Sequence, residues 1–159
     1  MLVPFEDLPK EQIVEFLRKK WGSVRMVAKG RLHHLDELPG VTYIEEGQIV
    51  GMATFFLEGE ECELTSLNST VRQKGIGAAL LKEVERLARE AGCTRLWCIT
   101  TNDNSRAIRF YQINGMTMCQ FYPNALERSR QLKPQIPLTG QDGIRIEHEL
   151  EFEKRWMNG

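Results

Sequence analysis

The sequence has few of the residues that mark a metal centre or a disulfide framework. It contains three histidines and four cysteines, and no two cysteines form a C-x-x-C pair. The neighbours His33 and His34 would point to opposite faces of a strand, which makes them poor joint ligands. We therefore expect no metal site. The cysteines lie in apolar or strand-like stretches and are expected to be buried free thiols in a reducing cytoplasm: Cys62, Cys93, Cys98 and Cys119.

An excess of charge of one sign and long hydrophobic runs are also missing. The 21 basic and 22 acidic side chains give a formal net charge of −1, so we expect neither a nucleic acid nor a membrane surface as partner. No apolar run approaches the roughly 20 residues of a membrane span. The opening stretch MLVPFEDLPKEQ has no basic start followed by an apolar run. We therefore expect no signal peptide and a cytoplasmic protein.

What is present fits one domain spanning residues 1–159, and its first half is typical of a helix followed by antiparallel strands. Asp7-Leu8-Pro9 opens a helix in which Ile13, Leu17 and Trp21 recur at helical spacing. Short polar turns then separate the strands, as in an antiparallel meander. We expect these strands at 24–28, 41–45, 48–57 and 61–68, with a turn at 38–40 between the first two.

The second half alternates helices and strands. We expect helices at 76–91 and 104–114, and strands at 94–101, 116–122 and 144–152. The strand–helix–strand unit over 61–101 should contain a parallel pair. The fold class is therefore α/β of the α+β type, with a mixed, mostly antiparallel sheet and helices on both faces. Residues 123–143 are expected to form an inserted loop between the last two strands, with a possible short helix at 124–132.

A glycine turn, VRQKGIGAALL at 71–81, joins an expected strand to an expected helix. Free amides at a helix start suit an anion, and glycines let the backbone approach a phosphate closely. A P-loop is absent, and Leu80 replaces the third glycine of a dinucleotide fold. Of the three phosphate-binding motifs considered, only the pattern R-x-x-G-x-G, over Arg72–Gly77, is present. The alternative is a turn in which the glycines only provide backbone flexibility and which binds no ligand.

A second stretch, NSRAIRFYQINGM at 104–116, makes the pattern more specific. With the glycine turn, it resembles the two signatures of the GNAT superfamily of acetyl-CoA-dependent N-acetyltransferases. The second signature is N-x-x-A-x-x-F-Y-x-x-x-G-F, and Met116 replaces its usual final phenylalanine. The resemblance covers the coarse architecture of the whole chain. It implies the GNAT fold, with a splayed parallel strand pair, and acetyl-CoA as co-substrate.

The resemblance also implies which residues bind this co-substrate. The pantetheine arm would enter the gap between the splayed strands and contact Asn104. Backbone groups of Leu67, Asn68 and Ser69 would bond the arm and polarise the thioester carbonyl. The pyrophosphate would bind to Arg72, Gln73, Lys74, Gly75, Ile76, Gly77 and Ala78.

Catalytic residues follow by the same resemblance. Tyr111 matches the frequent general acid, which would protonate the departing CoA thiolate; the alternative is a core aromatic residue. An attacking amine must lose a proton, and a carboxylate near the splay can accept it. We expect Glu63 to be this base, with Glu61 or a water chain as alternatives. Both glutamates would share a face with Leu67 unless a bulge intervenes.

On the acceptor side, the long segment 123–143 is expected to form a lid, with Phe121 and Tyr122 beneath it. Its basic residues would meet an acidic acceptor group or form a solvated helix face: Arg128, Arg130 and Lys133. His33 or His34 would touch substrate or act as a base, or would be a structural histidine.

The predicted function is acetyl transfer from acetyl-CoA to a primary amine of a small molecule or peptide. Two alternatives stay open, a non-catalytic acyl-CoA-binding sensor and a protein-directed acetyltransferase. A homodimer is possible, with the final strand pairing between subunits.

Overall fold

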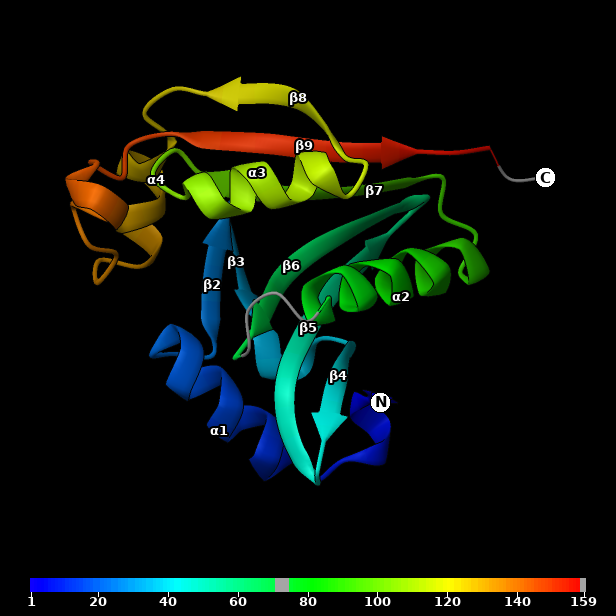
Figure 1. Ribbon diagram of the computed structural model, residues 1–159. Coiled ribbons are helices and arrows are strands. Elements are labelled where there is room, and N and C mark those ends of the chain that lie inside the picture. The colour runs from blue at the N-terminus through cyan, green and yellow to red at the C-terminus, as the bar shows by residue number, and fades with distance from the viewer. Residues whose placement is uncertain (71–74, 158–159) are drawn as a thin grey trace.

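A seven-stranded sheet with one parallel pair of strands forms the centre of the molecule (Figure 1). The computed structural model describes residues 1–70 and 75–157. The neighbouring strands run antiparallel except β6 and β7, as the sequence predicted. In spatial order the strands are β1 (Leu2–Pro4), β4 (Gly40–Glu45), β5 (Gln48–Glu58), β6 (Glu61–Ser69), β7 (Arg95–Thr101), β9 (Glu149–Arg155) and β8 (Thr117–Tyr122).

Helices cover both faces of the sheet, which confirms the expected fold class. Ala53 on β5 packs into a core cluster with Leu80 of α2. Its neighbour Met52 packs into a second cluster with Leu17 of α1. Because neighbouring strand residues point to opposite faces, α1 and α2 lie on opposite sides of the sheet. The helices are α1 (Lys10–Trp21), α2 (Ile76–Glu90), α3 (Ser105–Ile113) and α4 (Ala125–Leu132), with short 3₁₀ turns η1 (Phe5–Asp7), η2 (Leu35–Glu37) and η3 (Gln141–Gly143).

The parallel pairing of β6 with β7 is short, and the two strands separate beyond it. Their ladder runs from Glu61 opposite Arg95 to Leu64 opposite Cys98. After that point β6 stays paired with β5, and β7 stays paired with β9. In Figure 1 the two strands diverge toward the left of the view. The splay that the family resemblance implied is therefore present.

Residues 25–34 form a separate hairpin, which the sequence patterns did not predict. The expected strand at 24–28 exists as β2 (Arg25–Ala28), but its partner is β3 (Arg31–His34) and not the main sheet. Lys29 and Gly30 connect them, both with positive φ, as in a type I′ turn. The hairpin lies between α1 and the β7–β9 part of the sheet (Figure 1).

The last strand begins later than predicted and is not at an edge. β9 starts at Glu149, whereas the apolar alternation had placed the strand at 144–152. The side-chain oxygen of Asn102 accepts hydrogen bonds from the amides of Glu147 and His148, so these residues pair with a side chain instead of a strand. β9 lies between β7 and β8. It therefore has no free edge for a second copy of the chain, contrary to our expectation.

The segment before β9 contains the short helix that was expected at 124–132, observed as α4. The four cysteines are free, and three of them are buried; Cys119 is half-buried, contrary to expectation. Within residues 1–70 and 75–157, no helix has the length and apolar character needed to cross a membrane.

Candidate active site

Tyr111 lies where β6 and β7 separate. α3 carries it, and its ring packs against Phe152 of β9 and Phe110, with ring centroids 5.6 and 5.4 Å apart. Its phenol interacts with the thiol of Cys98, the last residue of β7 that pairs with β6. Tyr111 and Cys98 both belong to the buried core cluster. The predicted acid therefore lies at the vertex of the splay.

Burial keeps this tyrosine protonated. It raises the pKa of the Tyr111 phenol well above its ordinary value, and the Cys98 thiol raises that pKa further. Burial also raises the pKa of the Cys98 thiol. At neutral pH both groups therefore carry their protons. A protonated phenol is the form that a general acid needs.

The glycine turn leads directly into α2. Gly75 precedes the helix with a φ of 70°, in the left-handed region that glycine adopts without steric cost. The first amides of α2 have no partners within the helix and point out of its start. Ile76 is buried in the core, and Ala78 is half-buried. Three residues of the predicted pyrophosphate cradle lie outside the described residues: Arg72, Gln73 and Lys74.

Gly77 has a packing role that the motif alone did not reveal. A Cβ atom at this position would lie 3.2 Å from Cε1 and 3.3 Å from Cζ of Phe110. Because α2 follows β6 and α3 follows β7, this close approach is between the helices on the two sides of the splay. The second glycine therefore allows α2 to approach α3 closely.

The residues predicted to bond the pantetheine arm lie on the splayed half of β6. Leu67, Asn68 and Ser69 are half-buried and pair with β5. They lie beyond the last residue of β6 that pairs with β7. Their place agrees with a role for their backbone in the gap.

Asn104 caps the start of α3. Its side-chain oxygen accepts hydrogen bonds from the Ala107 amide (3.1 Å) and from Nε2 of Gln141 (3.3 Å). The neighbouring Asp103 carboxylate accepts the Gln141 amide. A Cβ on Gly140 would collide with that carboxylate, so glycine is needed for the approach. These contacts join the segment before β9 to the beginning of α3, next to the splay.

Glu63 forms a buried pair with His33. The His33 Nε2 atom lies 3.1 Å from Glu63 Oε1, and the side chains are only 5% and 4% exposed. The imidazole also packs against Phe56, with ring centroids 5.2 Å apart. His34, the next residue, is exposed. The structure thus joins two base candidates that sequence reasoning had treated separately.

A bulge changes the expected placement of the two glutamates. Ser66 lies opposite Thr54 and Leu64 opposite Phe55, which leaves Thr65 as an extra residue in β6. Leu67 therefore shares a face with Leu64, in the core under α2, and not with Glu63. Glu61 is half exposed and pairs with Arg95 at 2.9 Å. Both glutamates lie on the hairpin side of the sheet.

The hairpin tip adds an ammonium group to that side. Nζ of Lys29 lies 2.9 Å from Oε1 of Glu151, and 4.8 and 5.5 Å from the ring centroids of Trp97 and Tyr122. The Tyr122 hydroxyl donates to Glu151 at 2.7 Å. The backbone amide of Lys29 donates to Glu149 at 3.1 Å. We call the set Trp97, Tyr122 and Glu151 the ammonium cage.

Sequence reasoning missed this cage, because its members come from distant strands. Burial lowers the pKa of Lys29, but hydrogen bonds with Glu151 and Tyr122 outweigh it, so the pKa lies above its ordinary value. Burial raises the pKa of Glu151, but hydrogen bonds from Lys29, Tyr122 and Arg95 bring it below its ordinary value. Lys29 and Glu151 are therefore both charged at neutral pH.

The basic residues of the segment before β9 contact the protein's own chain. Arg130 donates to the carbonyl groups of Pro137 (2.8 Å) and Ile146 (2.7 Å). Nζ of Lys133 donates to the Arg25 carbonyl at 2.9 Å. The guanidinium of Arg128 packs next to Gly30 of the hairpin tip. These contacts favour a structural role over the expected contact with an acidic acceptor.

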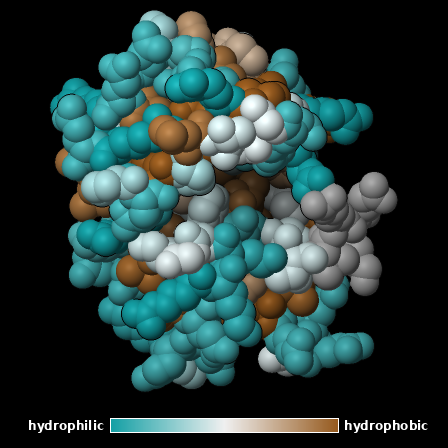
Figure 2. Space-filling model, turned by 90° about the vertical axis from the view of Figure 1, so that its left-hand side faces the viewer, coloured by the Kyte–Doolittle hydropathy of each residue, from teal (hydrophilic) through white to brown (hydrophobic). Residues whose placement is uncertain are grey.

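Beyond their ladder, β6 and β7 diverge toward the side of the molecule that Figure 2 shows. Figure 2 shows the left-hand side of Figure 1, with a central hollow that has hydrophobic residues at its floor. Beside the hairpin, a polar hollow of about 150 Å³ reaches Glu63. It is lined by Arg31, Phe56, Glu58, Glu61, Glu63 and Trp97.

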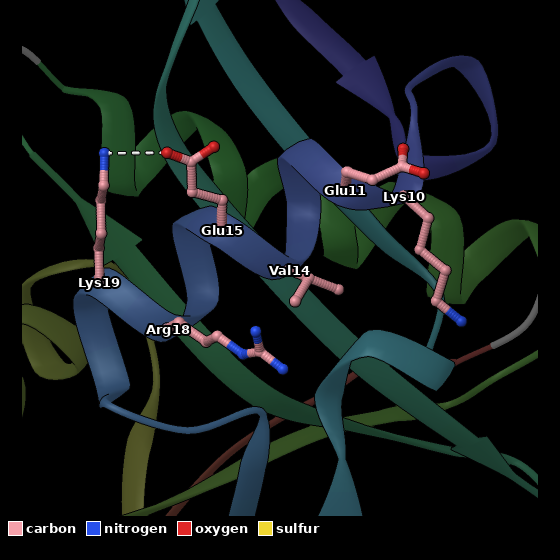
Figure 3. A pocket seen from close by; sticks show the side chains of 6 residues that line it. All are labelled: Lys10, Glu11, Val14, Glu15, Arg18 and Lys19. Atoms are coloured by element: carbon pink, nitrogen blue, oxygen red, sulfur yellow. Dashed lines mark ion pairs between the residues drawn. The ribbon is translucent and has the colours of Figure 1, made fainter.

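A wider hollow of about 630 Å³ lies along α1, away from these groups (Figure 3). The side chains that line it leave α1 toward solvent, and Glu15 and Lys19 form an ion pair of 3.3 Å there. It is lined by Lys10, Glu11, Val14, Glu15, Arg18 and Lys19. In the part of the chain that the structure describes, no group of three or more metal-ligating side chains is arranged to hold a metal ion.

Comparisons with known proteins agree with this geometry. Residues 6–116 match the acetyltransferase (GNAT) family. The uncharacterized proteins YdhI and YxbD of Bacillus subtilis (strain 168) are similar over nearly the whole chain. YdhI is 41% identical over 97% of both chains, and YxbD is 39% identical over 94% of both.

Solved structures share the fold at low sequence identity. A Bacillus subtilis acetyltransferase in complex with CoA aligns with a TM-score of 0.72, at 12% identity and 98% coverage of both chains. An aminoglycoside 6'-N-acetyltransferase complexed with coenzyme A aligns at 0.69, with 15% identity and coverage of 98% of this chain and 96% of that one. The ribosomal-protein-S18-alanine N-acetyltransferase from Escherichia coli aligns at 0.63, with 16% identity and coverage of 100% and 97%.

Proposed function

The chain belongs to the acetyltransferase (GNAT) family, and from this premise we propose that it transfers an acetyl group from acetyl-CoA directly to a primary amine of a small molecule or peptide. The observation that carries the proposal is the position of Tyr111, protonated and buried beside Cys98 where β6 and β7 separate. That position is the end of the gap in which a thioester would lie.

In the proposed reaction the amine nitrogen attacks the thioester carbonyl carbon. A C–N bond forms, the C–S bond breaks, and the CoA thiolate leaves with a proton from Tyr111. Backbone groups in the splayed half of β6, at Leu67, Asn68 and Ser69, would hold the arm and stabilise the carbonyl oxygen. The start of α2, from Gly75 to Ala78, would hold the pyrophosphate together with Arg72, Gln73 and Lys74. Asn104 would contact the pantetheine while it caps α3.

The amine must lose a proton before or during attack. We propose that Glu63 receives it, with His33 as its hydrogen-bonded partner. The pair is buried, and the polar hollow beside Glu63 gives the proton a route to solvent. Glu61, which lines the same hollow, or a chain of water molecules is the alternative base.

The acceptor would approach from the hairpin side of the sheet. There α4 packs on β2. The segment 123–143 would close one side of the region as a lid. The structural neighbours include an aminoglycoside acetyltransferase and a ribosomal-protein acetyltransferase. Small amines and protein amines are therefore both reasonable acceptors for this fold.

An assay of thiol release from acetyl-CoA over a panel of primary amines tests the proposal. We expect amine-dependent thiol release with at least one class of amine. Tight CoA binding without thiol release for any small or peptide amine would favour the non-catalytic acyl-CoA sensor. Thiol release with a folded protein partner alone would favour the protein-directed enzyme.

A further inference from the structure

The ammonium cage is a built binding site for a primary ammonium group, and the chain's own Lys29 fills it. Glu151, at its base, is 3% exposed and lies 2.9 Å from Nζ of Lys29. The rings of Trp97 and Tyr122 lie at cation–π distance from the same atom. A buried carboxylate and two aromatic faces are the groups that recognise an alkylammonium ion.

The cage lies beside the splay on the acceptor side. Glu151 pairs with Ile99, the first residue of β7 beyond its ladder with β6. Glu149 pairs with Thr101 in the same splayed half. An amine that reaches the gap from the hairpin side therefore passes this cage.

Lys29 occupies the cage from an unfavourable backbone position. Its φ of 51° is in the left-handed region, where asparagine, aspartate and glycine are favoured over lysine. The side chain is 41% exposed, so it is not enclosed by the protein. The turn would fold more easily with another residue, and what lysine adds at this position is the ammonium in the cage.

We propose that the cage is a subsite for an acceptor with two ammonium groups, and that Lys29 is a tethered ammonium that such an acceptor displaces. This inference rests on the proposed acetyltransferase function. One amine of the acceptor would enter the gap and react, and the second would take the place of Lys29. The basic residues Arg130 and Lys133 bind backbone carbonyls, and the guanidinium of Arg95 pairs with Oε2 of Glu151. The acceptor's ammonium would therefore bind to Oε1 of Glu151, in the place of Lys29.

Calorimetric titration of the full chain with pentane-1,5-diamine, without acetyl-CoA, tests the subsite. Lys29→Asn vacates the cage and keeps a residue that suits the turn; Lys29→Met keeps the aliphatic stem and serves as a second variant. We expect the Kd for the diamine to fall about tenfold in both. The Kd for 1-aminopentane, whose single ammonium can also enter the vacated cage, should fall as well but stay above that of the diamine.

Two further variants provide the controls. Arg31→Met removes a positive charge from the same hairpin, but its guanidinium lies over Phe56 and pairs with Glu58, outside the cage. It should leave the diamine Kd within about twofold of wild type. Adding Trp97→Leu to Lys29→Asn should cancel the gain. An unchanged Kd in both Lys29 variants, or an equal gain in Arg31→Met, would overturn the proposal.

The binding readout separates the two proposals. Tighter diamine binding in the Lys29 variants, without thiol release from acetyl-CoA in any assay, would reject the acetyltransferase function and keep the ammonium subsite. Turnover of monoamines with no effect of Lys29 on diamine binding would reject the subsite and keep the function.

Discussion

Substitution of Tyr111 should give a clear change in kcat. In Tyr111→Phe the ring still packs against Phe110 and Phe152, so the fold should persist. The departing thiolate loses its proton donor. We expect kcat to fall about 100-fold, with the KM for acetyl-CoA within about twofold of wild type. Tyr43→Phe, which changes a half-buried tyrosine on β4, is the matched control. An unaltered kcat would remove Tyr111 from the mechanism.

Two buried glutamates on β9 should give opposite pH effects on stability. Interactions with Lys29, Tyr122 and Arg95 outweigh burial and hold the pKa of Glu151 below its ordinary 4.5, so the stability it contributes is lost as pH falls below that value. Burial raises the pKa of Glu149 above 4.5, although the Lys29 amide opposes this. Stability therefore falls as pH rises from 4.5 through the pKa of folded Glu149.

Urea unfolding at several pH values checks this pair. Glu151→Gln should flatten the loss of unfolding free energy on the acid side of pH 4.5. Glu149→Gln should flatten the loss on the alkaline side. If both variants change the unfolding free energy on the same side of pH 4.5, the assigned charge states are wrong.

At the scale of elements, the contact of α2 with α3 is expected to link packing to co-substrate binding. Gly77→Ala adds a methyl group 3.2 Å from the Phe110 ring, so the helices must shift by a few tenths of an ångström. The better helix propensity of alanine partly offsets this strain. We expect little change in Tm but a KM for acetyl-CoA raised about tenfold.

The double variant Gly77→Ala with Phe110→Leu checks the cause. Leucine frees space for the new methyl group, so the KM should return toward that of Phe110→Leu alone. Additive effects of the two changes would show that Gly77 acts through the phosphate and not through the helix contact.

The segment between β8 and β9 should matter for the acceptor and not for the co-substrate. Deletion of residues 124–138 removes α4 and the contacts of Arg128 and Lys133 with the hairpin. It leaves the glycine turn and Asn104 in place. We expect loss of amine-dependent turnover with acetyl-CoA binding preserved, measured by calorimetry. Unchanged turnover would exclude a lid role.

Some elements could be predicted from local sequence and others could not. Helical spacing and the glycines around 76–91 and 104–114 identify α2 and α3, because these helices bury one face. The β2–β3 hairpin escaped prediction, because its four-residue strands are stabilised by the contacts of Lys29 with Glu149 and Glu151, more than 100 residues away. The late start of β9 depends on hydrogen bonds to Asn102, which no periodicity encodes.

For the molecule as a whole, the two halves of the site differ in how far sequence predicts them. The proposed co-substrate side rests on two local motifs, so the residues proposed for it follow from the family resemblance. The proposed acceptor side combines Lys29, Trp97, Tyr122 and Glu151 from four parts of the chain. No local sequence pattern marks any of these residues as part of a site. Only the folded sheet brings them together.

Direct acetyl transfer is the central claim, and one labelling experiment tests it. The chain is incubated with acetyl-CoA that carries isotope in its acetyl group and with an amine that supports thiol release. Mass spectrometry of the products then follows the label. We predict one labelled amide per thiol released and no label left on the protein. Label retained on the protein, or thiol release with labelled acetate and no amide, would contradict direct transfer.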